Sequence, residues 1–367
     1  MATVTKSIGA TGRDYSTITA WEADLDNDTP YDASDDAVGE CYDDSDFDMQ
    51  GDFTLNGGGT LGLDSVKLSV AAGERHDGSA GTGVRVYTST TTAYRFYLVA
   101  ISEDTAPYAL TMEWLELDGS DEGVANELIN SNSQTAGNSA VPFVINCLIH
   151  NAEKRWLNST TYDTRLQNNI FYTCGTGSTE TIGIYIRGYK NNSGMYNCTL
   201  HGVISTRTIS SANIKAVYWI YNYGQTRLHS NLSTGHDLPN SSSTDVWGFY
   251  SSSGKTPYSN TTRYSRNATE GESAITLMLE GTAGSAACVT GVVPANVYVS
   301  TTLGSEDLRI KDNSEGIIGG GLDSGTTLGL NIDIEGFDRE EADAWDIGAD
   351  QFVAEDTVGA SFLLLDF

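Results

Sequence analysis

The residues that could do chemistry in this chain are mostly carboxylates, and a dense group of them lies in Thr111-Met-Glu-Trp-Leu-Glu-Leu-Asp118. Glu113 and Glu116 could share a face with a residue one coil away. Polysaccharide hydrolases need two carboxylates about 5–9.5 Å apart, and lyases pair acidic calcium ligands with a basic residue. The nearest basic candidates are Arg165, Arg187 and Lys190. Because the chain has 49 acidic residues, such a group also arises by chance. We therefore predict no catalytic residues and keep Glu113 and Glu116 as candidates for an enzymatic alternative.

Five aspartates near the N-terminus have the spacing of calcium ligands. They fall at positions 1, 3, 5, 9 and 12 of an EF-hand loop and are Asp24, Asp26, Asp28, Asp32 and Asp35. However, Thr29 replaces the glycine at position 6, Pro30 follows it, and position 12 is Asp instead of Glu. Residues 24–52 contain no Lys or Arg, which favours a solvated acidic loop. We predict no cofactor, with calcium at this loop as the alternative.

The histidines and aromatic residues offer weaker signals. His76-Asp77 has the composition of a base with its orienting carboxylate, but it lies in a Gly-rich stretch without a nucleophile, which favours a turn. His150 and His201 follow strand-like runs at matching positions and could stack on each other or hold a metal. Three aromatic residues could stack on sugars or pack between coils, namely Trp219, Tyr221 and Tyr223.

The elements that would position these groups are indicated by a repeat. Short β-rich runs carry a small polar residue in one register, at Cys147, Asn169, Cys198, Asn231 and Asn267. The spacings are 22, 29, 33 and 36 residues. A strand with a turn residue at fixed phase is typical of stacked coils, each of which cannot bury its apolar face alone. The repeat predicts an all-β, right-handed parallel β-helix (a solenoid), with Asn or Cys stacked at an inward bend.

The coils are expected to occupy residues 53–330, where short apolar strands alternate with polar turns. Many strands are apolar on consecutive residues, as in continuously stacked parallel strands. The predicted strands include Val66–Val70, Val84–Tyr87, Phe96–Ile101, Leu110–Leu117, Phe143–Ile149, Leu166–Tyr172, Ile182–Ile186, Met195–Leu200, Ala216–Tyr221 and Gly248–Tyr250.

The two ends of the chain have their own composition. Residues 1–52 are predicted to form an N-terminal cap and acidic loop, with a short capping helix that Ser16 or Thr17 begins. Residues 331–367 are predicted to close the domain, with a buried Arg339–Asp346 pair. The terminal residues are apolar and either form a last strand or dock on a partner through Phe362, Leu363, Leu364, Leu365 and Phe367.

Charge and cysteine content exclude some functions. Net charge is −29, so the surface repels nucleic acid and anionic membranes, and we predict neither as a partner. The five cysteines lack metal-site or disulfide spacing and are expected to be reduced and structural. The N-terminal residues lack the pattern of a signal peptide, which predicts synthesis in a cytoplasm without export.

The two ends resemble a known family. Asp333-Ile-Glu-Gly-Phe-Asp-Arg339 followed by Trp345-Asp-Ile-Gly-Ala-Asp-Gln-Phe352 is similar to the closing motif of right-handed parallel β-helix proteins, except that Glu335 stands where the motif has Asp. Ile8-Gly-Ala-Thr-Gly-Arg-Asp-Tyr-Ser-Thr-Ile18 is similar to their entry motif. Val38-Gly-Glu-Cys-Tyr42 and Ala71-Ala-Gly-Glu-Arg-His-Asp-Gly78 resemble versions found in tailed-phage and environmental viral proteins. The fold hosts lyases, hydrolases, adhesins and virion parts, so the motif predicts fold more strongly than function.

The resemblance and the missing export signal together predict a non-enzymatic structural protein on a phage virion, as a capsid decoration or cement protein or a fibre. Its expected location is the virion, after synthesis in the host cytoplasm. The expected partners are other virion proteins of the capsid or tail, a host surface glycan, and other copies of the same chain. The alternatives are a tailspike-like polysaccharide lyase or glycoside hydrolase, and a glycan-binding adhesin.

Deletion of residues 360–367 tests the docking interpretation of the tail. If these residues seat the protein on a particle, the truncated chain should keep its fold and thermal melting but fail to join particles in a co-assembly assay. Normal incorporation of the truncated chain would contradict it.

Overall fold

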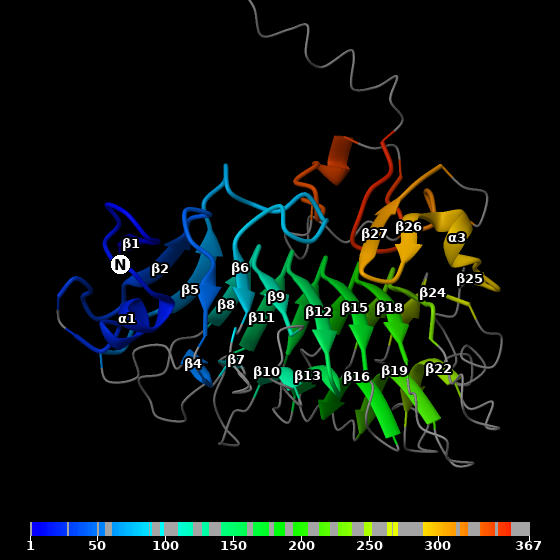
Figure 1. Ribbon diagram of the computed structural model, residues 1–367, viewed down its shortest axis with the longest axis horizontal. Coiled ribbons are helices and arrows are strands. Elements are labelled where there is room, and N and C mark those ends of the chain that lie inside the picture. The colour runs from blue at the N-terminus through cyan, green and yellow to red at the C-terminus, as the bar shows by residue number, and fades with distance from the viewer. Residues whose placement is uncertain are drawn as a thin grey trace, which may run out of the picture.

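The protein is a parallel β-solenoid, seen in a computed structural model (Figure 1). The structure describes residues 2–27, 29–49, 51–55, 61–87, 89, 96–98, 109–119, 127–131, 141–159, 164–175, 180–187, 194–204, 213–220, 227–236, 246–251, 263–265, 267–270, 289–312, 316–321, 331–341 and 344–353. Three parallel sheets, here called A, B and C, run along it side by side. The prediction of stacked parallel coils is confirmed.

Sheet A has nine strands, each paired in parallel with the strand of the next coil. They are β1 (Thr3–Ile8), β2 (Asp36–Cys41), β5 (Ser65–Val70), β8 (Ala109–Glu113), β11 (Val141–Ile145), β14 (Arg165–Gln167), β17 (Gly194–Tyr196), β20 (Arg227–His229) and β23 (Arg263–Ser265). The coils therefore start at β1, inside the range 1–52 that the sequence assigned to a cap.

Sheet B also has nine strands, and each except β25 comes next in the chain after a sheet A strand. They are β3 (Phe47–Asp48), β6 (Arg85–Tyr87), β9 (Glu116–Asp118), β12 (Leu148–Ala152), β15 (Ile170–Cys174), β18 (Thr199–Val203), β21 (Leu232–Thr234), β24 (Ala268–Thr269) and β25 (Val289–Thr290).

Sheet C has seven described strands and forms the third side. They are β4 (Phe53–Leu55), β7 (Phe96–Leu98), β10 (Glu127–Ser131), β13 (Arg155–Ser159), β16 (Glu180–Arg187), β19 (Asn213–Ile220) and β22 (Val246–Ser251). The core is enclosed by the three sheets, since side chains that alternate along each strand point inward in rows. One such row runs through Phe53, Phe96, Ile129, Leu157, Ile184, Val217 and Phe249, all buried.

The bend between sheets A and B corrects one feature of the prediction. Four apolar runs were expected to be single strands, but each is two strands that meet at a residue with a left-handed backbone: Leu110–Leu117, Phe143–Ile149, Leu166–Tyr172 and Met195–Leu200. The bend residues of these runs are Trp114, Asn146, Asn168 and Asn197. Ser230 has the same conformation between β20 and β21, and all five have φ between 50° and 64°. Asn tolerates this conformation better than most residues with a side chain, which accounts for its recurrence here.

The residues that follow the bend stack in one buried column. The Asn169 side chain accepts a hydrogen bond from Cys147 N (2.8 Å) and donates to Val144 O (2.8 Å). Asn231 and Asn267 repeat this pattern two and three coils later. The side chains thus satisfy backbone groups that the bend removes from strand pairing, which otherwise would be costly in an apolar core.

The N-terminal helix α1 (Ile18–Ala23) is short and packs its apolar face inward. Thr17 is its N-cap, accepting a hydrogen bond from Ala20 N at 3.0 Å. Trp21 is fully buried and lies against Gly39, where an added Cβ would come within 2.6 Å of the indole. The capping role predicted for this helix stays a prediction.

The C-terminal part does not continue the coils. After α3 (Pro294–Val297), an antiparallel hairpin of β26 (Tyr298–Thr302) and β27 (Ser305–Ile310) forms, so the parallel coils described here end before the expected boundary at residue 330. A single-turn 3-10 helix, η1 (Arg339–Glu341), follows. Together these residues lie along sheet B (Figure 1). We call residues 292–352, as far as they are described, the covering segment.

The covering segment is attached to the outer face of sheet B by packing and by hydrogen bonds. Backbone amides at Gly348 and Ala349 donate to Ser230 O (2.8 Å) and Thr199 Oγ1 (3.0 Å). A second apolar cluster joins the outward side chains of sheet B to those of the segment, including Leu148, Ile170, Leu232, Ile310, Ile334 and Ile347. Gly348 has φ 115°, and a Cβ there would approach Thr199 Oγ1 to 2.8 Å.

We expect Asn231→Ala to lower the free energy of unfolding by roughly 3 kcal/mol, because it leaves several buried backbone and side-chain groups without a partner. The measurement is chemical denaturation followed by circular dichroism. Asn27→Ala, in an exposed turn, serves as the control. A loss below about 0.5 kcal/mol for Asn231→Ala, typical of surface changes, would contradict the role of the column.

Candidate functional site

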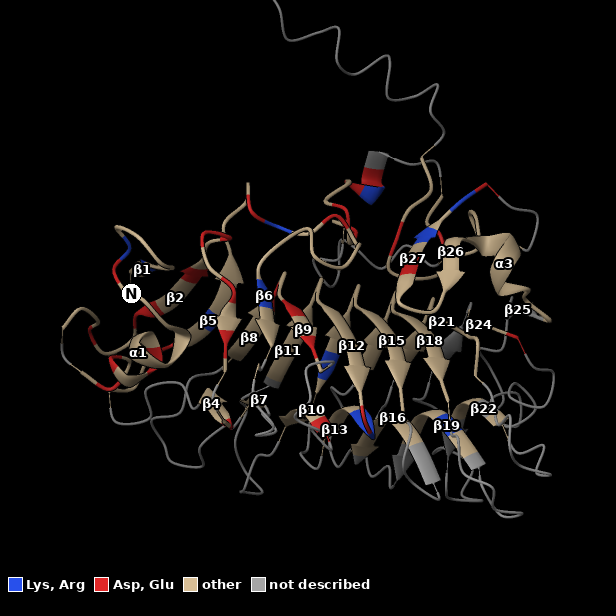
Figure 2. Cartoon of the chain, in the orientation of Figure 1, with Lys and Arg blue, Asp and Glu red and all other residues tan. Residues whose placement is uncertain are grey.

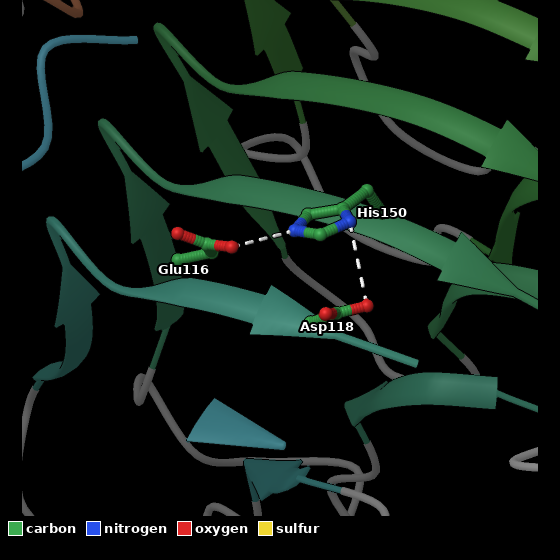
Figure 3. Close-up of side chains that lie close together, drawn as sticks. All are labelled: Glu116, Asp118 and His150. Atoms are coloured by element: carbon green, nitrogen blue, oxygen red, sulfur yellow. Dashed lines mark hydrogen bonds and ion pairs between the residues drawn. The ribbon is translucent and has the colours of Figure 1, made fainter. Parts of the chain in front are cut away.

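Three titratable side chains meet on the outer face of sheet B (Figure 3). Glu116 and Asp118 lie on β9, and His150 lies beside them on β12, where it pairs with Asp118. His150 Nε2 is 3.0 Å from Glu116 Oε1, and His150 Nδ1 is 3.4 Å from Asp118 Oδ1. Alternation along both strands places all three on the same face, while Leu117 and Ile149 point into the core.

Each carboxylate oxygen of this cluster has a partner within the protein. Glu116 Oε2 accepts a hydrogen bond from Gly81 N (2.7 Å), which ties residues 71–84 to sheet B. Asp118 Oδ2 accepts from Arg85 (2.6 and 3.1 Å), and Asp118 Oδ1 accepts from Asn151 Nδ2 (2.8 Å). The cluster therefore has the polar partners that a buried charged group requires.

The cluster is also closed to solvent. Side-chain exposure is 2% for Glu116, 4% for His150 and 6% for Asp118. Tyr172 stacks on the His150 ring, with centroids 4.6 Å apart and planes inclined by 4°. Burial, together with the Glu116 charge, raises the pKa of the Tyr172 hydroxyl above its ordinary value.

One nitrogen and two carboxylates could hold a metal, since their ligand atoms lie within 4.8 Å of one another. They could also serve as a base with orienting acids. Catalysis needs a position where substrate or water can enter. In this structure the Gly81 amide, Arg85 and Asn151 donate hydrogen bonds to the two carboxylates. The hydrogen bond from Gly81 joins residues 71–84 to sheet B.

The structure separates Glu113 from Glu116. Glu113 ends β8 in sheet A, before the bend at Trp114, and Glu116 begins β9 in sheet B. Glu113 accepts a hydrogen bond from Ser69 Oγ (2.7 Å) and lies 3.1 Å from Lys67 Nζ. The bend therefore puts the two carboxylates on different sheets, and each meets residues one coil away: Glu113 meets Ser69 and Lys67, and Glu116 meets His150.

The N-terminal aspartates have partners of different kinds. Asp24 accepts hydrogen bonds from Tyr15 and Asn27, and Asp35 accepts from the Ala2 and Asp32 amides. Those amide hydrogen bonds lower the pKa of Asp35. Asp28 lies outside the described residues, so calcium in this loop stays a prediction.

A cleft of about 640 Å³ near α1 is lined by Asp46, Asp48 and Asp52 among others, and the acidic character of this end is visible in Figure 2.

The histidines are placed as follows. Tyr172 stands between His150 and His201 in the row, so the two histidines do not stack on each other. His76 Nδ1 accepts from Gly78 N (3.3 Å), and Asp77 binds Ser79 N and Thr82 Oγ1, so the pair forms a turn as predicted.

The predicted Arg339–Asp346 pair takes a different form. Arg339 is fully buried, but it donates to the carbonyl oxygens of Asp346, Gly348 and Ala349. The Asp346 carboxylate accepts from the Gly319 and Phe352 amides instead. Both charged side chains thus form hydrogen bonds with backbone groups of the covering segment. The expected direct pair between Arg339 and the Asp346 carboxylate is wrong. Burial raises the pKa of Asp346.

The four described cysteines are buried free thiols, at Cys41, Cys147, Cys174 and Cys198. Burial raises the pKa of Cys147 and of Cys198 to about 12, which keeps both thiols protonated. Cys288 lies outside the described residues, as do the tail residues from Phe362 to Phe367.

A second surface that could bind a ligand runs along the outer face of sheet C. Strand register aligns polar and aromatic residues in one row, which we call the outer row: Tyr97, Asn130, Asn158, Tyr185 and Tyr218. All five are half-buried at the surface, whereas the strand neighbours whose side chains are described are buried. The Tyr185 and Tyr218 rings meet edge to face at 5.6 Å.

Charged residues lie beside the outer row. Arg155 Nη1 is 3.1 Å from Glu127 Oε1, and the Arg155 guanidinium lies 5.2 Å from the centroid of the Tyr185 ring. Lys215 Nζ lies 4.3 Å from the centroid of the Tyr218 ring. Asn158 Oδ1 and Arg155 Nε are shielded atoms with no hydrogen-bond partner in the described structure. Such atoms are rare in folded proteins and mark places for ordered water or ligand groups.

Sequence reasoning did not find the outer row. It singled out Trp219, Tyr221 and Tyr223 instead. Trp219 is next to Tyr218 on β19, but its side chain is not described. Tyr221 and Tyr223 lie outside the described residues. The signal available was a single polar or aromatic residue within an apolar strand, as Tyr185 is in Ile182–Ile186. Using that signal requires the register between coils.

Comparison with family models, curated proteins and solved structures finds no match to this chain. Among the described residues, no helix is long and apolar enough to cross a membrane.

A pH prediction follows from His76. Burial lowers its pKa to about 4, so the unfolded chain takes up the proton more readily than the folded one. This contribution to stability is complete above about pH 6.5 and is lost as the pH falls toward 4. His76 should account for about 2 kcal/mol of lost stability between pH 7 and pH 5.

His76→Gln removes this titration, so the drop in unfolding free energy between pH 7 and pH 5 should be smaller in the variant by that amount. Denaturant titrations of both proteins at the two pH values measure the difference. Buried carboxyl groups with a raised pKa, such as Asp333, contribute to the pH dependence in the opposite direction. That contribution is the same in both proteins, so it cancels when their changes in unfolding free energy are compared. An identical pH dependence in both proteins would refute the assignment.

Proposed function

We propose that this protein is a non-enzymatic β-solenoid that binds a polysaccharide chain along the outer face of sheet C. The observation that carries the proposal is the outer row, in which Tyr97, Tyr185 and Tyr218 flank two asparagines in adjacent coils. Three aromatic rings and two amides in one straight line on a rigid sheet suit a repeating, hydroxyl-rich ligand.

The chemistry of the row matches that of sugars. Aromatic faces bind the apolar faces of sugar rings, and a tyrosine side chain also carries a hydroxyl that can donate or accept. The amide of Asn158 can both donate to and accept from sugar hydroxyls. Arg155 and Glu127 add a donor and an acceptor at the edge of the row. Ligand sites commonly combine apolar surface with a few fixed polar groups in this way.

The spacing of the row also fits. Neighbouring parallel strands lie about 4.8 Å apart, so five coils present binding groups over roughly 19 Å. The separation of about 4.8 Å between neighbouring strands is close to the length of one sugar unit in an extended polysaccharide. Successive sugars can therefore contact successive coils. Because the row is built on strands, its groups are held at fixed separations and bind with little loss of conformational entropy.

The state of the carboxylates supports binding without turnover. Glu116 and Asp118 are closed to solvent and bound to Gly81, Arg85 and Asn151, and Glu113 lies on another sheet. Beside the outer row, Glu127 is paired with Arg155. The described groups thus favour holding a sugar chain over cleaving it.

We further propose that the solenoid belongs to a phage virion, where it decorates the capsid or forms part of a fibre. Support comes from two segments, Val38-Gly-Glu-Cys-Tyr42 and Ala71-Ala-Gly-Glu-Arg-His-Asp-Gly78, that resemble those of viral β-helix proteins. We also propose that the solenoid is right-handed, because nearly all connections between parallel strands have that hand. Helix α1 is proposed to cap its first coil. A glycan-binding outer row would give such a particle a means of attaching to a host surface.

Replacing a ring of the outer row tests the glycan proposal. After a glycan array identifies a bound polysaccharide, Tyr185→Ala should weaken its binding about tenfold or more, since a buried aromatic contact at an interface contributes over about 1.4 kcal/mol. Isothermal titration calorimetry measures the loss.

Tyr42→Ala is the matched control, because Tyr42 is a half-buried tyrosine at the N-terminal end that also lies under an arginine. Equal affinity for Tyr185→Ala and wild type would place binding elsewhere, and a protein that binds no glycan at all would contradict the proposal. Release of sugar fragments during the titration would favour the enzymatic alternative.

A further inference from the structure

A separate group of carboxylates lies in the covering segment, away from the outer row. Asp333, Glu335 and Asp350 each place a carboxylate oxygen within 4.8 Å of the others. Asp333 and Asp350 are buried, and Glu335 is exposed. The group therefore opens to solvent on the Glu335 side only.

The local backbone fixes two of the three carboxylates. Asp333 accepts hydrogen bonds from the amides of Glu335 (2.9 Å) and Phe337 (2.7 Å) through Oδ1, and from Gln351 (3.0 Å) through Oδ2. Asp350 Oδ2 accepts from Ile310 N at 2.5 Å, which links the end of β27 to the last described residues. Their positions are thus set by the fold and do not depend on a ligand.

An independent observation points to a missing partner. Asp350 is 1% exposed, yet its Oδ1 has no hydrogen-bond partner in the described structure. A buried carboxylate oxygen without a partner is costly. Because Asp350 belongs to the group in which three carboxylates converge, we infer that the missing partner of its Oδ1 is a cation or a proton.

The nearby arginines do not supply that partner through contact. Arg339 donates to the carbonyls of Gly348 and Ala349, and no ion pair among the described residues joins it to Asp333 or Asp350. Arg309 binds Asp307 and Glu335. Burial and the neighbouring charges raise the pKa of Asp350 well above its ordinary value, and burial raises that of Asp333 to about 6.

We propose that Asp333, Glu335 and Asp350 bind a divalent cation, best matched by calcium, which fastens the last described residues of the covering segment to β27 within the same segment. Calcium takes six to eight oxygen ligands in flexible geometry. The three carboxylates provide protein ligands, and water entering on the Glu335 side completes the shell. Bound there, the ion would join residues 333–335, residue 350 and, through the Asp350–Ile310 hydrogen bond, the β26–β27 hairpin.

Calcium titration of the chelator-treated full chain tests this site, with calorimetry and thermal melting as readouts in buffer of constant ionic strength. Wild type should bind one calcium ion per chain and melt at a higher temperature with calcium than without it. Asp350→Asn should abolish this binding. Glu335→Gln, at an exposed side chain, should weaken it about tenfold or more, because affinity follows ligand charge. Asp26→Asn is the control in the N-terminal acidic loop.

The absence of saturable binding to wild type would overturn the proposal and leave the carboxyl pair sharing a proton. Unchanged binding in Glu335→Gln and Asp350→Asn would also overturn it, as would loss of binding in Asp26→Asn alone, which would place the ion in the N-terminal loop. If Asp350→Asn does not fold, Glu335→Gln decides the question by itself.

Discussion

The solenoid depends on how each coil turns from sheet A into sheet B. A residue with a left-handed backbone at the bend withdraws amide and carbonyl groups from strand pairing, and these groups face an apolar interior. The Asn169, Asn231 and Asn267 side chains replace the lost partners, each bonding one coil before its own. In an interior of low dielectric constant, such hydrogen bonds are strong when complete and costly when broken.

This column also determines what the outer faces present. Because the bends stack in register, the residues at each strand position align into rows along the solenoid. The outward row of sheet B includes apolar Leu148, Ile170 and Leu232 and is covered by the C-terminal segment. The outward row of sheet C carries tyrosine and asparagine, remains half-exposed, and is the surface on which we place ligand binding.

The two clusters of acidic groups have different relations to this framework. Glu116, Asp118 and His150 form a polar cluster whose described atoms are paired, so it stabilises the join between residues 71–84 and sheet B. Asp350 in the covering segment retains one unpaired buried oxygen. The first cluster is therefore a complete hydrogen-bond network, whereas the second has a carboxylate oxygen that can still bind a ligand.

Much of the fold could be predicted from the sequence, because the repeat of Cys147, Asn169, Cys198, Asn231 and Asn267 reports a backbone requirement that recurs in each coil. The position of the bends was less accessible, since Leu110–Leu117 and its counterparts read as continuous apolar runs until a left-handed residue divides them. The outer row could not be predicted, because it depends on register between strands that loops of varied length separate. The fold-back of the covering segment depends on contacts such as Thr199 with Ala349, 150 residues apart.

The most direct test of the account is a crystal structure of the protein with an oligosaccharide that it binds. The account predicts sugar rings lying along sheet C, stacked on Tyr185 and hydrogen-bonded to the Asn158 amide. A sugar seated on another face, such as the cleft beside α1, would contradict the assignment of sheet C as the binding surface.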